Sequence, residues 1–202
     1  MYRFIKRFFD LILSLLLFIA ISPVFLVFIV LVRIKHGAPV FFRQNRSTLD
    51  GRSFGLYKFR TMTNDCDENG VLLPDDKRVT KFGAWLRNTS LDELPELLNI
   101  IKGDISIIGP RPMPVEYTSY FTDKEKHRFY VRGGLIPPES LKGNPTPSWD
   151  EQLQWEAEYG EQVSFKLDTK IFFNVFYLLF KRDSGNYGIY VRDTLINERK
   201  SK

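Results

Sequence analysis

The chain begins with one long apolar run, which sets the expectation for its first element. From residue 11 to residue 32, the only polar or helix-breaking residues are Ser14, Ser22 and Pro23, and basic residues flank the run on both sides. At a rise of about 1.5 Å per residue, a helix of this length just spans a hydrocarbon core of roughly 30 Å. We therefore expect residues 1–36 to form a membrane anchor.

Pro23 lies in the middle of this run and predicts a break in the helix. Proline has no backbone N–H and its ring clashes with the carbonyl of Ile19, which the Ser22 hydroxyl is able to bond instead. Lys and Arg favour the cytoplasmic side of a membrane, and here both flanks are basic. The residues leave two arrangements open. One is a kinked helix that crosses once, and the other is a helix that breaks at Ser22 and Pro23 and leaves by the face through which it entered.

Beyond the anchor, the pattern changes to short alternating segments. β-branched and aromatic residues on either side of a Leu-Asp-Gly turn predict a β-hairpin of residues 40–44 and 53–59. Apolar residues at helical spacing predict helices at residues 81–88, 94–101, 116–130, 149–159 and 167–180. Polar and Gly/Pro-rich stretches predict loops at residues 64–76 and 133–148.

These elements define the expected fold class and domain organisation. The class is α+β, with a mostly helical compact domain and a small β-hairpin or sheet after the N-terminal membrane helix. The domain is expected to cover residues 37–185, and a weakly patterned C-terminal tail follows at residues 186–202. The last predicted helix has an apolar face that includes Ile171 and Phe172, which suits either the core or the membrane interface.

Composition and charge restrict the classes of site and partner. A chain of 202 residues with 44% hydrophobic residues has enough apolar side chains for one folded domain. Cys66 is the single cysteine, so an intramolecular disulfide framework is excluded, and His36 and His127 do not complete a zinc site with it. A reducing, cytosol-facing domain fits this usage. The net charge of +5 leaves nucleic acid, an anionic membrane leaflet and phosphorylated substrates as candidate partners.

An acidic pair, Asp92 and Glu93, is the sharpest candidate for chemistry. A carboxylate among arginines is able to attack phosphorus. Residues 90–93 also match a helix-capping box, which is an ordinary structural use of such acids. Pro95 disfavours that box, because with Ser90 as the cap it would remove an intrahelical hydrogen bond. A helix start near Asp92 would instead favour an incoming phosphate, and from these residues alone capping and catalysis both remain open.

Several cations stand near turns or element ends, where side chains project into clefts. The candidate substrate-binding residues among them are Lys58, Arg60, Arg87, Arg111 and Arg132. Arg111 stands out because prolines on both sides fix its backbone, which lowers the entropy lost on binding a phosphate. These cations surround an acidic pair that would repel a nucleic-acid backbone, so no nucleic acid is expected as a partner. A non-enzymatic, membrane-tethered binding module is the rival class.

Several motifs in a fixed order carry a family resemblance. They are Lys-Phe-Arg-Thr-Met at residues 58–62, Leu-Pro-Asp-Asp at 73–76, Ser-Leu-Asp-Glu-Leu-Pro at 90–95, Lys-Gly-Asp at 102–104 and Gly-Pro-Arg-Pro at 109–112. Over most of residues 1–132 the chain resembles the bacterial sugar transferase family, in particular its small monotopic phosphoglycosyl transferases that consist of the catalytic domain alone. The resemblance implies transfer of a phosphosugar from a UDP-sugar to a polyprenol phosphate with Mg²⁺. It also implies attachment to the bacterial inner membrane, with the catalytic domain facing the cytoplasm.

The resemblance also implies roles for single residues. Asp92 matches the family's aspartyl nucleophile and Glu93 its partner acid, and both are candidate Mg²⁺ ligands. Ser22 and Pro23 match the break of a re-entrant membrane helix. Attack by Asp92 would release UMP and leave a covalent aspartyl-phosphosugar. A glycosyltransferase that moves only the sugar is the nearer alternative and would release UDP. A second copy of the chain, forming a homodimer, is a further candidate partner.

One segment departs from the family pattern. After Arg132, many relatives continue with Pro-Gly and a Gly-Leu-Ala-Gln-Val-Asn-Gly-Arg-like stretch, whereas residues 133–140 here read Gly-Gly-Leu-Ile-Pro-Pro-Glu-Ser. The resemblance therefore does not identify the donor sugar, and the role of residues 135–148 stays open.

Overall fold

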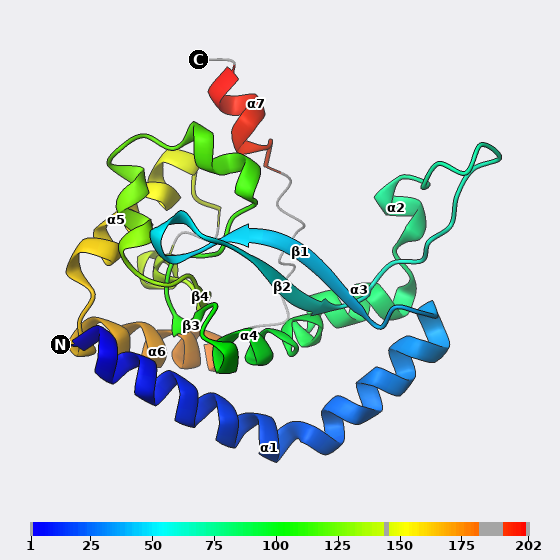
Figure 1. Ribbon diagram of the computed structural model, residues 1–202, viewed down its shortest axis with the longest axis horizontal. Coiled ribbons are helices and arrows are strands. Elements are labelled where there is room, and N and C mark those ends of the chain that lie inside the picture. Colours follow the sequence, from blue (N-terminus) through cyan, green and yellow to red (C-terminus); the bar gives the residue numbers. More distant parts are fainter. Residues whose placement is uncertain (1, 144–145, 182–191, 201–202) are drawn as a thin grey trace.

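The fold is described from a computed structural model, which covers residues 2–143, 146–181 and 192–200 (Figure 1). Within these residues the chain is mostly helical and has two small sheets, which confirms the predicted α+β class. The expected domain boundary at residue 185 lies outside the described residues. Part of the expected tail does as well, but Leu195–Lys200 form a short helix, α7.

The N-terminal apolar run forms a single long helix, α1, over Tyr2–His36. It is the one helix among the described residues that is long and apolar enough to cross a membrane. Figure 1 shows that α1 bends near its middle, where Pro23 lies. The Ser22 hydroxyl donates to the Ile19 carbonyl at 2.8 Å, which confirms the local chemistry expected at the break. The helix is bent there but not interrupted.

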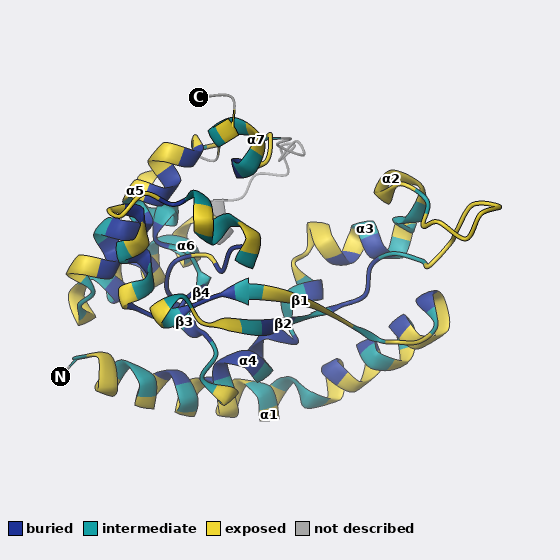
Figure 2. Cartoon of the chain, turned by 45° about the horizontal axis from the view of Figure 1, so that its top comes forward, coloured by how far each residue is buried: buried dark blue, intermediate teal, exposed yellow. Residues whose placement is uncertain are grey.

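Both halves of α1 pack against the same domain, which lies on the concave side of the bend (Figure 1). In the first half, Arg7 donates to the carbonyls of Ile100 and Ile101 at 2.6 and 2.8 Å. In the second half, Phe25 and Phe28 are buried in the largest apolar cluster. The opposite side of α1 is exposed along much of its length and is predominantly apolar (Figure 2). This outer surface associates the protein with the membrane.

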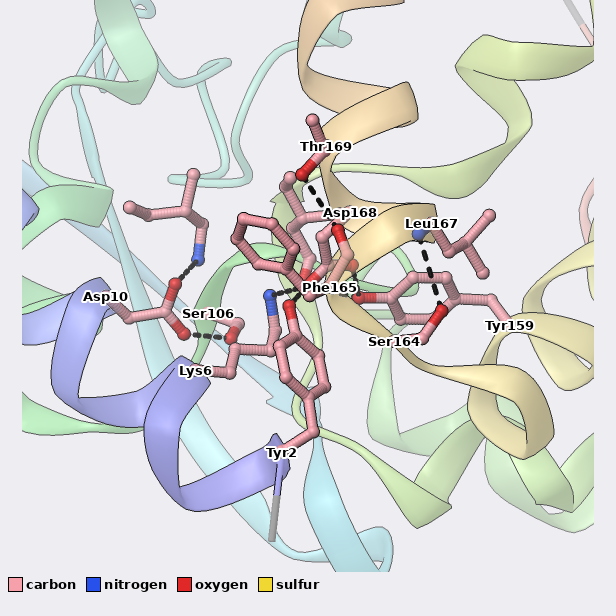
Figure 3. Close-up of polar contacts among 12 residues, drawn as sticks. Tyr2, Lys6, Asp10, Ser106, Tyr159, Ser164, Phe165, Leu167, Asp168 and Thr169 are labelled. Atoms are coloured by element: carbon pink, nitrogen blue, oxygen red, sulfur yellow. Dashed lines mark hydrogen bonds and ion pairs between the residues drawn. The ribbon is translucent and has the colours of Figure 1, made fainter.

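Buried polar contacts fasten the first turns of α1 to the domain (Figure 3). Asp168 accepts hydrogen bonds from the hydroxyl of Tyr2 at 2.5 Å, from Lys6 Nζ at 2.8 Å and from the hydroxyl of Tyr159 at 2.6 Å. One turn later, Asp10 of α1 accepts from the hydroxyl of Ser106. Because each of these groups is buried or partly buried, losing a partner would leave an unpaired polar group, and the helix is held firmly at this end.

The predicted β-hairpin is confirmed. β1 (Phe41–Ser47) pairs antiparallel with β2 (Ser53–Phe59) through a short 3-10 turn at Leu49–Gly51. Asp50 in this turn has a φ of 56°, a left-handed conformation that Asp tolerates better than most residues. The hairpin supplies one wall of the site described below.

Two of the three central helices follow the sequence prediction, whereas the short helix at Asp75–Arg78 was not predicted and begins within the expected loop of residues 64–76. α2 (Asp75–Arg78) closes the polar loop, and α3 (Lys81–Asn88) and α4 (Glu96–Lys102) match predicted helices. α4 ends at Gly103, which adopts a left-handed φ of 93° as expected for a helix C-cap. Asn99 of α4 fixes the helix on β2, since its side-chain amide accepts from the Tyr57 amide at 2.9 Å and donates to the Gly55 carbonyl at 2.8 Å.

The prediction of one helix over residues 116–130 is wrong. The segment forms two 3-10 turns, Val115–Tyr120 and Glu125–Tyr130. The Glu125 carboxylate accepts from the Thr122 amide at 2.7 Å, and the Thr122 hydroxyl accepts from the Glu125 amide at 3.3 Å. This reciprocal capping starts a second segment at Thr122 and prevents a continuous helix.

The prediction of an unbroken loop over residues 133–148 is also wrong. β4 (Gly134–Ile136) pairs parallel with β3 (Ser106–Ile108), and Pro138–Lys142 form a 3-10 turn. Gly134 permits the pairing, because a Cβ there would lie only 2.1 Å from the Gly109 amide nitrogen.

The last two predicted helices are confirmed with slightly longer bounds, as α5 (Trp149–Gln162) and α6 (Phe165–Lys181). In α6, Ile171 is buried in the core, whereas Phe172, Phe173 and Phe176 are exposed. The helix therefore faces the core with one side and leaves aromatic residues uncovered on the other.

Candidate active site

The acidic pair lies in a tight turn between α3 and α4. Residues Leu91–Glu93 form a 3-10 turn, and Ser90 before it has a left-handed φ of 57°. The Ser90 side chain makes no capping hydrogen bond, so the capping box is absent. α4 begins after Pro95, three residues later than a cap at Asp92 would imply, and Pro95 there costs no intrahelical bond. Helix capping therefore does not account for the pair.

Both carboxylates line an open pocket of about 660 Å³. Its walls come from the β-hairpin, the segment after β2, α2, α3 and the turn that carries the pair. Of the residues predicted from the sequence, those that line it are Lys58, Arg60, Arg87, Asp92 and Glu93. The volume lies within the range of small-molecule sites.

Glu93 is held by two cations. Lys58 Nζ lies 2.6 Å from Glu93 Oε1, and Arg111 Nη2 lies 3.6 Å from the same oxygen. Burial alone would raise the pKa of Glu93, but the charges of Lys58 and Arg111 outweigh it and hold the pKa below its ordinary value. Glu93 is therefore charged and fixes two cations beside Asp92.

Asp92 has the opposite electrostatic environment. It is buried, and burial raises its pKa above the ordinary value despite the opposing charges of Lys58 and Arg87. The negative charge of Glu93 adds to the increase. Adjacent carboxyl groups whose pKa values are shifted in opposite directions are suited to different roles in one reaction.

Arg87 is brought to the pocket by close packing of α3. Its Nε donates to the Thr61 hydroxyl at 2.9 Å. α3 approaches the Thr61 backbone directly because residue 83 is glycine, and a Cβ there would lie 1.9 Å from the Thr61 carbonyl oxygen. The rest of the Arg87 guanidinium is exposed to the pocket.

Arg60 lines the pocket but has a structural bonding pattern. Its buried guanidinium donates to the carbonyl oxygens of Met62, Ala38 and His36. It thereby ties the end of α1 to the end of β2. Its role in substrate binding stays a prediction, and most of the N–H groups of its guanidinium already donate to backbone carbonyls within the protein.

Arg132 lies in a different pocket, of about 470 Å³, together with Arg3, Lys6 and Arg7 near the start of α1. Its Nε donates to the Gly103 carbonyl at 2.9 Å. The structure does not bring Arg132 together with the acidic pair.

Arg111 is positioned by a buried ion pair that the sequence did not reveal. Arg128 Nη2 and Glu156 Oε2 lie 2.8 Å apart, and their side chains are 2% and 0% exposed. Glu156 Oε1 accepts from the Arg111 amide at 3.2 Å, and Arg128 donates to the Arg111 carbonyl. Both backbone groups of Arg111 are thus held, while its side chain is free to face Glu93.

Two further residues of the site, Arg46 and Glu96, were also missed. Both line a small crevice of about 40 Å³ that shares Lys58 and Glu93 with the larger pocket. Glu96 Oε1 lies 3.3 Å from Lys58 Nζ, and burial raises the pKa of Glu96 to about 7. The strand alternation of β1 offered a signal for Arg46, because it places residue 46 on the same face as residues 42 and 44.

The groups of the pocket that would hold a metal ion are the carboxylates of Asp92 and Glu93. No group of three or more His, Cys, Asp or Glu side chains that could hold a metal ion occurs among the described residues. Mg²⁺ commonly binds through one or two carboxylates together with substrate phosphates and water. Asp92 and Glu93 fit a Mg²⁺ that arrives with a phosphorylated substrate better than a permanently bound ion.

Comparison with known proteins identifies the family. The model of the bacterial sugar transferase family matches residues 1–182. An uncharacterized sugar transferase, EpsL, of Bacillus subtilis is 44% identical over 167 residues, which cover 83% of this chain and 83% of that protein. The exopolysaccharide production protein ExoY of Sinorhizobium fredii is 34% identical and covers 83% of this chain and 82% of its own length.

A longer relative is named for its reaction. The UDP-glucose:undecaprenyl-phosphate glucose-1-phosphate transferase of Xanthomonas campestris pv. campestris is 34% identical over 80% of this chain, and the match covers 36% of that protein. Relatives named as transferases favour an enzyme over the non-enzymatic binding module. The chain belongs to the bacterial sugar transferase family and is a transferase.

Proposed function

We propose that the protein transfers a phosphosugar from a UDP-sugar to a polyprenol phosphate and releases UMP. The observation that carries the proposal is the acidic pair in a pocket lined by cations, in which Asp92 is buried and Glu93 is charged. The name of the Xanthomonas relative, which describes transfer of glucose 1-phosphate from UDP-glucose to undecaprenyl phosphate, supports the same chemistry.

Asp92 is the proposed nucleophile. Its carboxylate attacks the β-phosphorus of the donor, the bond between that phosphorus and the bridging oxygen breaks, and UMP leaves. The enzyme then carries the sugar phosphate as an acyl phosphate on Asp92. A phosphate oxygen of the polyprenol phosphate attacks the same phosphorus and frees the carboxylate. Dividing the transfer into two steps avoids bringing two anionic substrates together at once.

The cations of the pocket bind and orient the phosphates. Lys58, Arg87 and Arg111 lie around the pair and spread the negative charge that develops during the transfer. Glu93 keeps Lys58 and Arg111 in place through its Oε1. Mg²⁺, when bound by Asp92 and Glu93, would offset the repulsion between the nucleophile and the diphosphate.

We also propose that α1 is a re-entrant helix with both ends on the cytoplasmic side of the bacterial inner membrane. Its first half is fastened through Asp168 and its second half through Phe25 and Phe28, and all of these contacts are to one domain. A straight crossing would separate one set of contacts from the domain. The exposed aromatic residues of α6, including Phe172 and Phe173, suit the membrane interface beside it.

Incubation with donor alone tests the covalent step. A panel of UDP-sugars is supplied without acceptor, and intact-protein mass spectrometry should detect a phosphosugar adduct together with released UMP. Asp92→Asn should form no adduct and release no UMP, because the amide keeps the size of the side chain but is not a nucleophile. Asp123→Asn is the matched control, since the Asp123 side chain is fully exposed. UMP release by a folded Asp92→Asn protein would refute the mechanism, and release of UDP by the wild type would establish the glycosyltransferase alternative.

Removal of divalent cations tests the metal. Excess EDTA should stop both half-reactions, and added Mg²⁺ should restore them. Undiminished adduct formation in EDTA would remove Mg²⁺ from the mechanism.

Tag accessibility tests the topology. Tags before Met1 and after Lys202 should both be labelled only after the cytoplasmic face is exposed. Replacing Ser22 with Ala and Pro23 with Leu restores the hydrogen-bond donor at residue 23 and should straighten the helix, which would favour crossing and move the N-terminus to the other side. A wild-type N-terminus that is accessible from outside intact cells would refute the re-entrant arrangement.

A further inference from the structure

Among the described residues, no carboxylate lies within ion-pair distance of Arg46 of β1, although Glu96 and Glu116 are near enough to act on its charge. Its Nη2 donates to the side-chain oxygen of Gln44 at 2.6 Å, and its Nη1 lies 3.5 Å from the Pro112 carbonyl oxygen. Its Nε is buried and has no hydrogen-bond partner. Within the part of the chain that the structure describes, Arg46 forms no ion pair of 4.0 Å or less.

The strand register places Arg46 at the junction of the pocket and the crevice. Across the hairpin, residue 42 pairs with Lys58 and Arg46 pairs with residue 54, so even-numbered positions share one face. Arg46 and Lys58 from this face line both spaces, and Glu93 lines both as well. Arg46 is therefore close to the groups proposed to act on the donor.

A second cation adds to the charge at this point. Arg111 lines the crevice with Arg46. Burial lowers the pKa of Arg46, and the positive charge of Arg111 lowers it further; Glu96, Tyr117 and Glu116 oppose this shift but do not reverse it. A partly buried guanidinium beside another cation is costly unless an anion neutralises it. A bound phosphate would supply this anion, so the two guanidinium groups suit a phosphate ligand.

We propose that Arg46 is a further substrate-binding residue, and that with Arg111 it binds the diphosphate of the nucleotide-sugar donor where the pocket meets the crevice. The inference rests on the proposed function for the identity of the donor. Guanidinium groups suit this task because they are always charged and offer two parallel N–H donors to phosphate oxygens. Pro112, the residue after Arg111, links the two arginines through the contact of its carbonyl oxygen with Arg46 Nη1.

Binding of UDP to the full chain in detergent micelles tests the inference. Arg46→Gln should weaken UDP binding by about tenfold to a hundredfold, the usual consequence of losing a charged hydrogen bond. Arg46→Lys keeps the positive charge but loses the two parallel N–H donors of the guanidinium, so its UDP affinity should lie between those of Arg46→Gln and the wild type. Arg43→Gln is the matched control: it is on the opposite face of β1, where its guanidinium lies 5.9 Å from the centroid of the Tyr57 ring. Its UDP affinity should equal that of the wild type.

The outcomes separate this inference from the proposed function. Equal UDP affinity of Arg46→Gln, Arg46→Lys and wild type, with unchanged thermal transitions, would overturn the role of Arg46 and leave the covalent mechanism intact. If the wild type bound neither UDP nor inorganic pyrophosphate, a diphosphate site here would be refuted. If UDP binding depended on Arg46 but no phosphosugar adduct formed on Asp92, the inference would stand and the proposed mechanism would fail. Should Arg46→Gln not fold, the comparison between Arg46→Lys and Arg43→Gln decides.

Discussion

Replacing Glu96 by glutamine should stabilise the protein at alkaline pH, although Glu96 lies beside the acidic pair. Glu96 is 4% exposed, and burial raises its pKa from 4.5 to about 7. The unfolded chain releases this proton near pH 4.5 and the folded chain near pH 7. Between these values the folded state binds more protons, so the free energy of unfolding falls as pH rises through the window.

The size of the effect follows from the shift. At about 1.4 kcal/mol per pH unit, a shift from 4.5 to about 7 corresponds to at most roughly 3–4 kcal/mol of stability lost above pH 7. A glutamine at this position would carry no charge and would avoid that loss, but it would also give up the charge attraction between Glu96 and the Lys58 ammonium, which lie 3.3 Å apart. We therefore expect Glu96→Gln to gain about 1–3 kcal/mol at pH 8 and almost nothing at pH 4.5.

Urea unfolding of the full chain in detergent micelles at the two pH values measures this difference. Glu116→Gln is the control, since Glu116 is exposed and a surface substitution there should change stability by less than about 0.5 kcal/mol. Destabilisation by Glu96→Gln at pH 8, or the same effect at both pH values, would refute the reasoning. Either result would mean that the folded protein holds Glu96 charged and well paired with Lys58.

Three other perturbations test the site. Glu156→Gln should cost about 3–5 kcal/mol of unfolding free energy, because it leaves the buried Arg128 without its charged partner. Replacing Arg128 and Glu156 together by Met and Leu should recover stability but raise the KM for donor, because neither new side chain holds the backbone of Arg111. Arg132→Gln should lower stability by about 1 kcal/mol and leave UDP affinity unchanged, since Arg132 does not line the pocket of the acidic pair, and a tenfold loss of affinity would contradict this. Asp92 must be ionised to react, and burial raises its pKa. As the pH is lowered, the rate of adduct formation should therefore begin to fall at a higher pH than it would for an ordinary aspartate. A rate that falls only at or below pH 3.8 would contradict the role of burial.

Elements defined by local chemistry could be predicted from the sequence. The hairpin followed from its turn residues, α4 ended at Gly103 because glycine takes the left-handed cap, and the bend of α1 followed from Pro23. The β3–β4 pair could not be predicted, because it joins segments that are far apart in the sequence. The sequence shows a glycine at residue 134, but the reason for it, the close approach of the Gly109 backbone, is visible only in the structure.

The site could be predicted in its centre but not in its surroundings. Asp92, Glu93 and Lys58 lie together as expected. A sequence records the charge of an arginine but not which carbonyls its N–H groups already bind, and this is what distinguishes Arg60 from Arg87. Positioning by buried pairs such as Arg128 and Glu156 was equally invisible, because long-range packing brings such partners together.

The alternation of β2 links the membrane anchor to the site. Phe59 packs on Phe25 and Phe28 of α1, with ring centroids 5.2 and 6.1 Å apart, whereas its neighbour Lys58 points to the other face and contacts Glu93. The bend at Pro23 allows the second half of α1 to reach Phe59 while the first half stays fastened to α6 (Figure 1). β2 thus contacts the anchor through Phe59 and the acidic pair through Lys58. We therefore expect that straightening α1 would move β2 and displace Lys58 from Glu93, even if no residue of the pocket were changed.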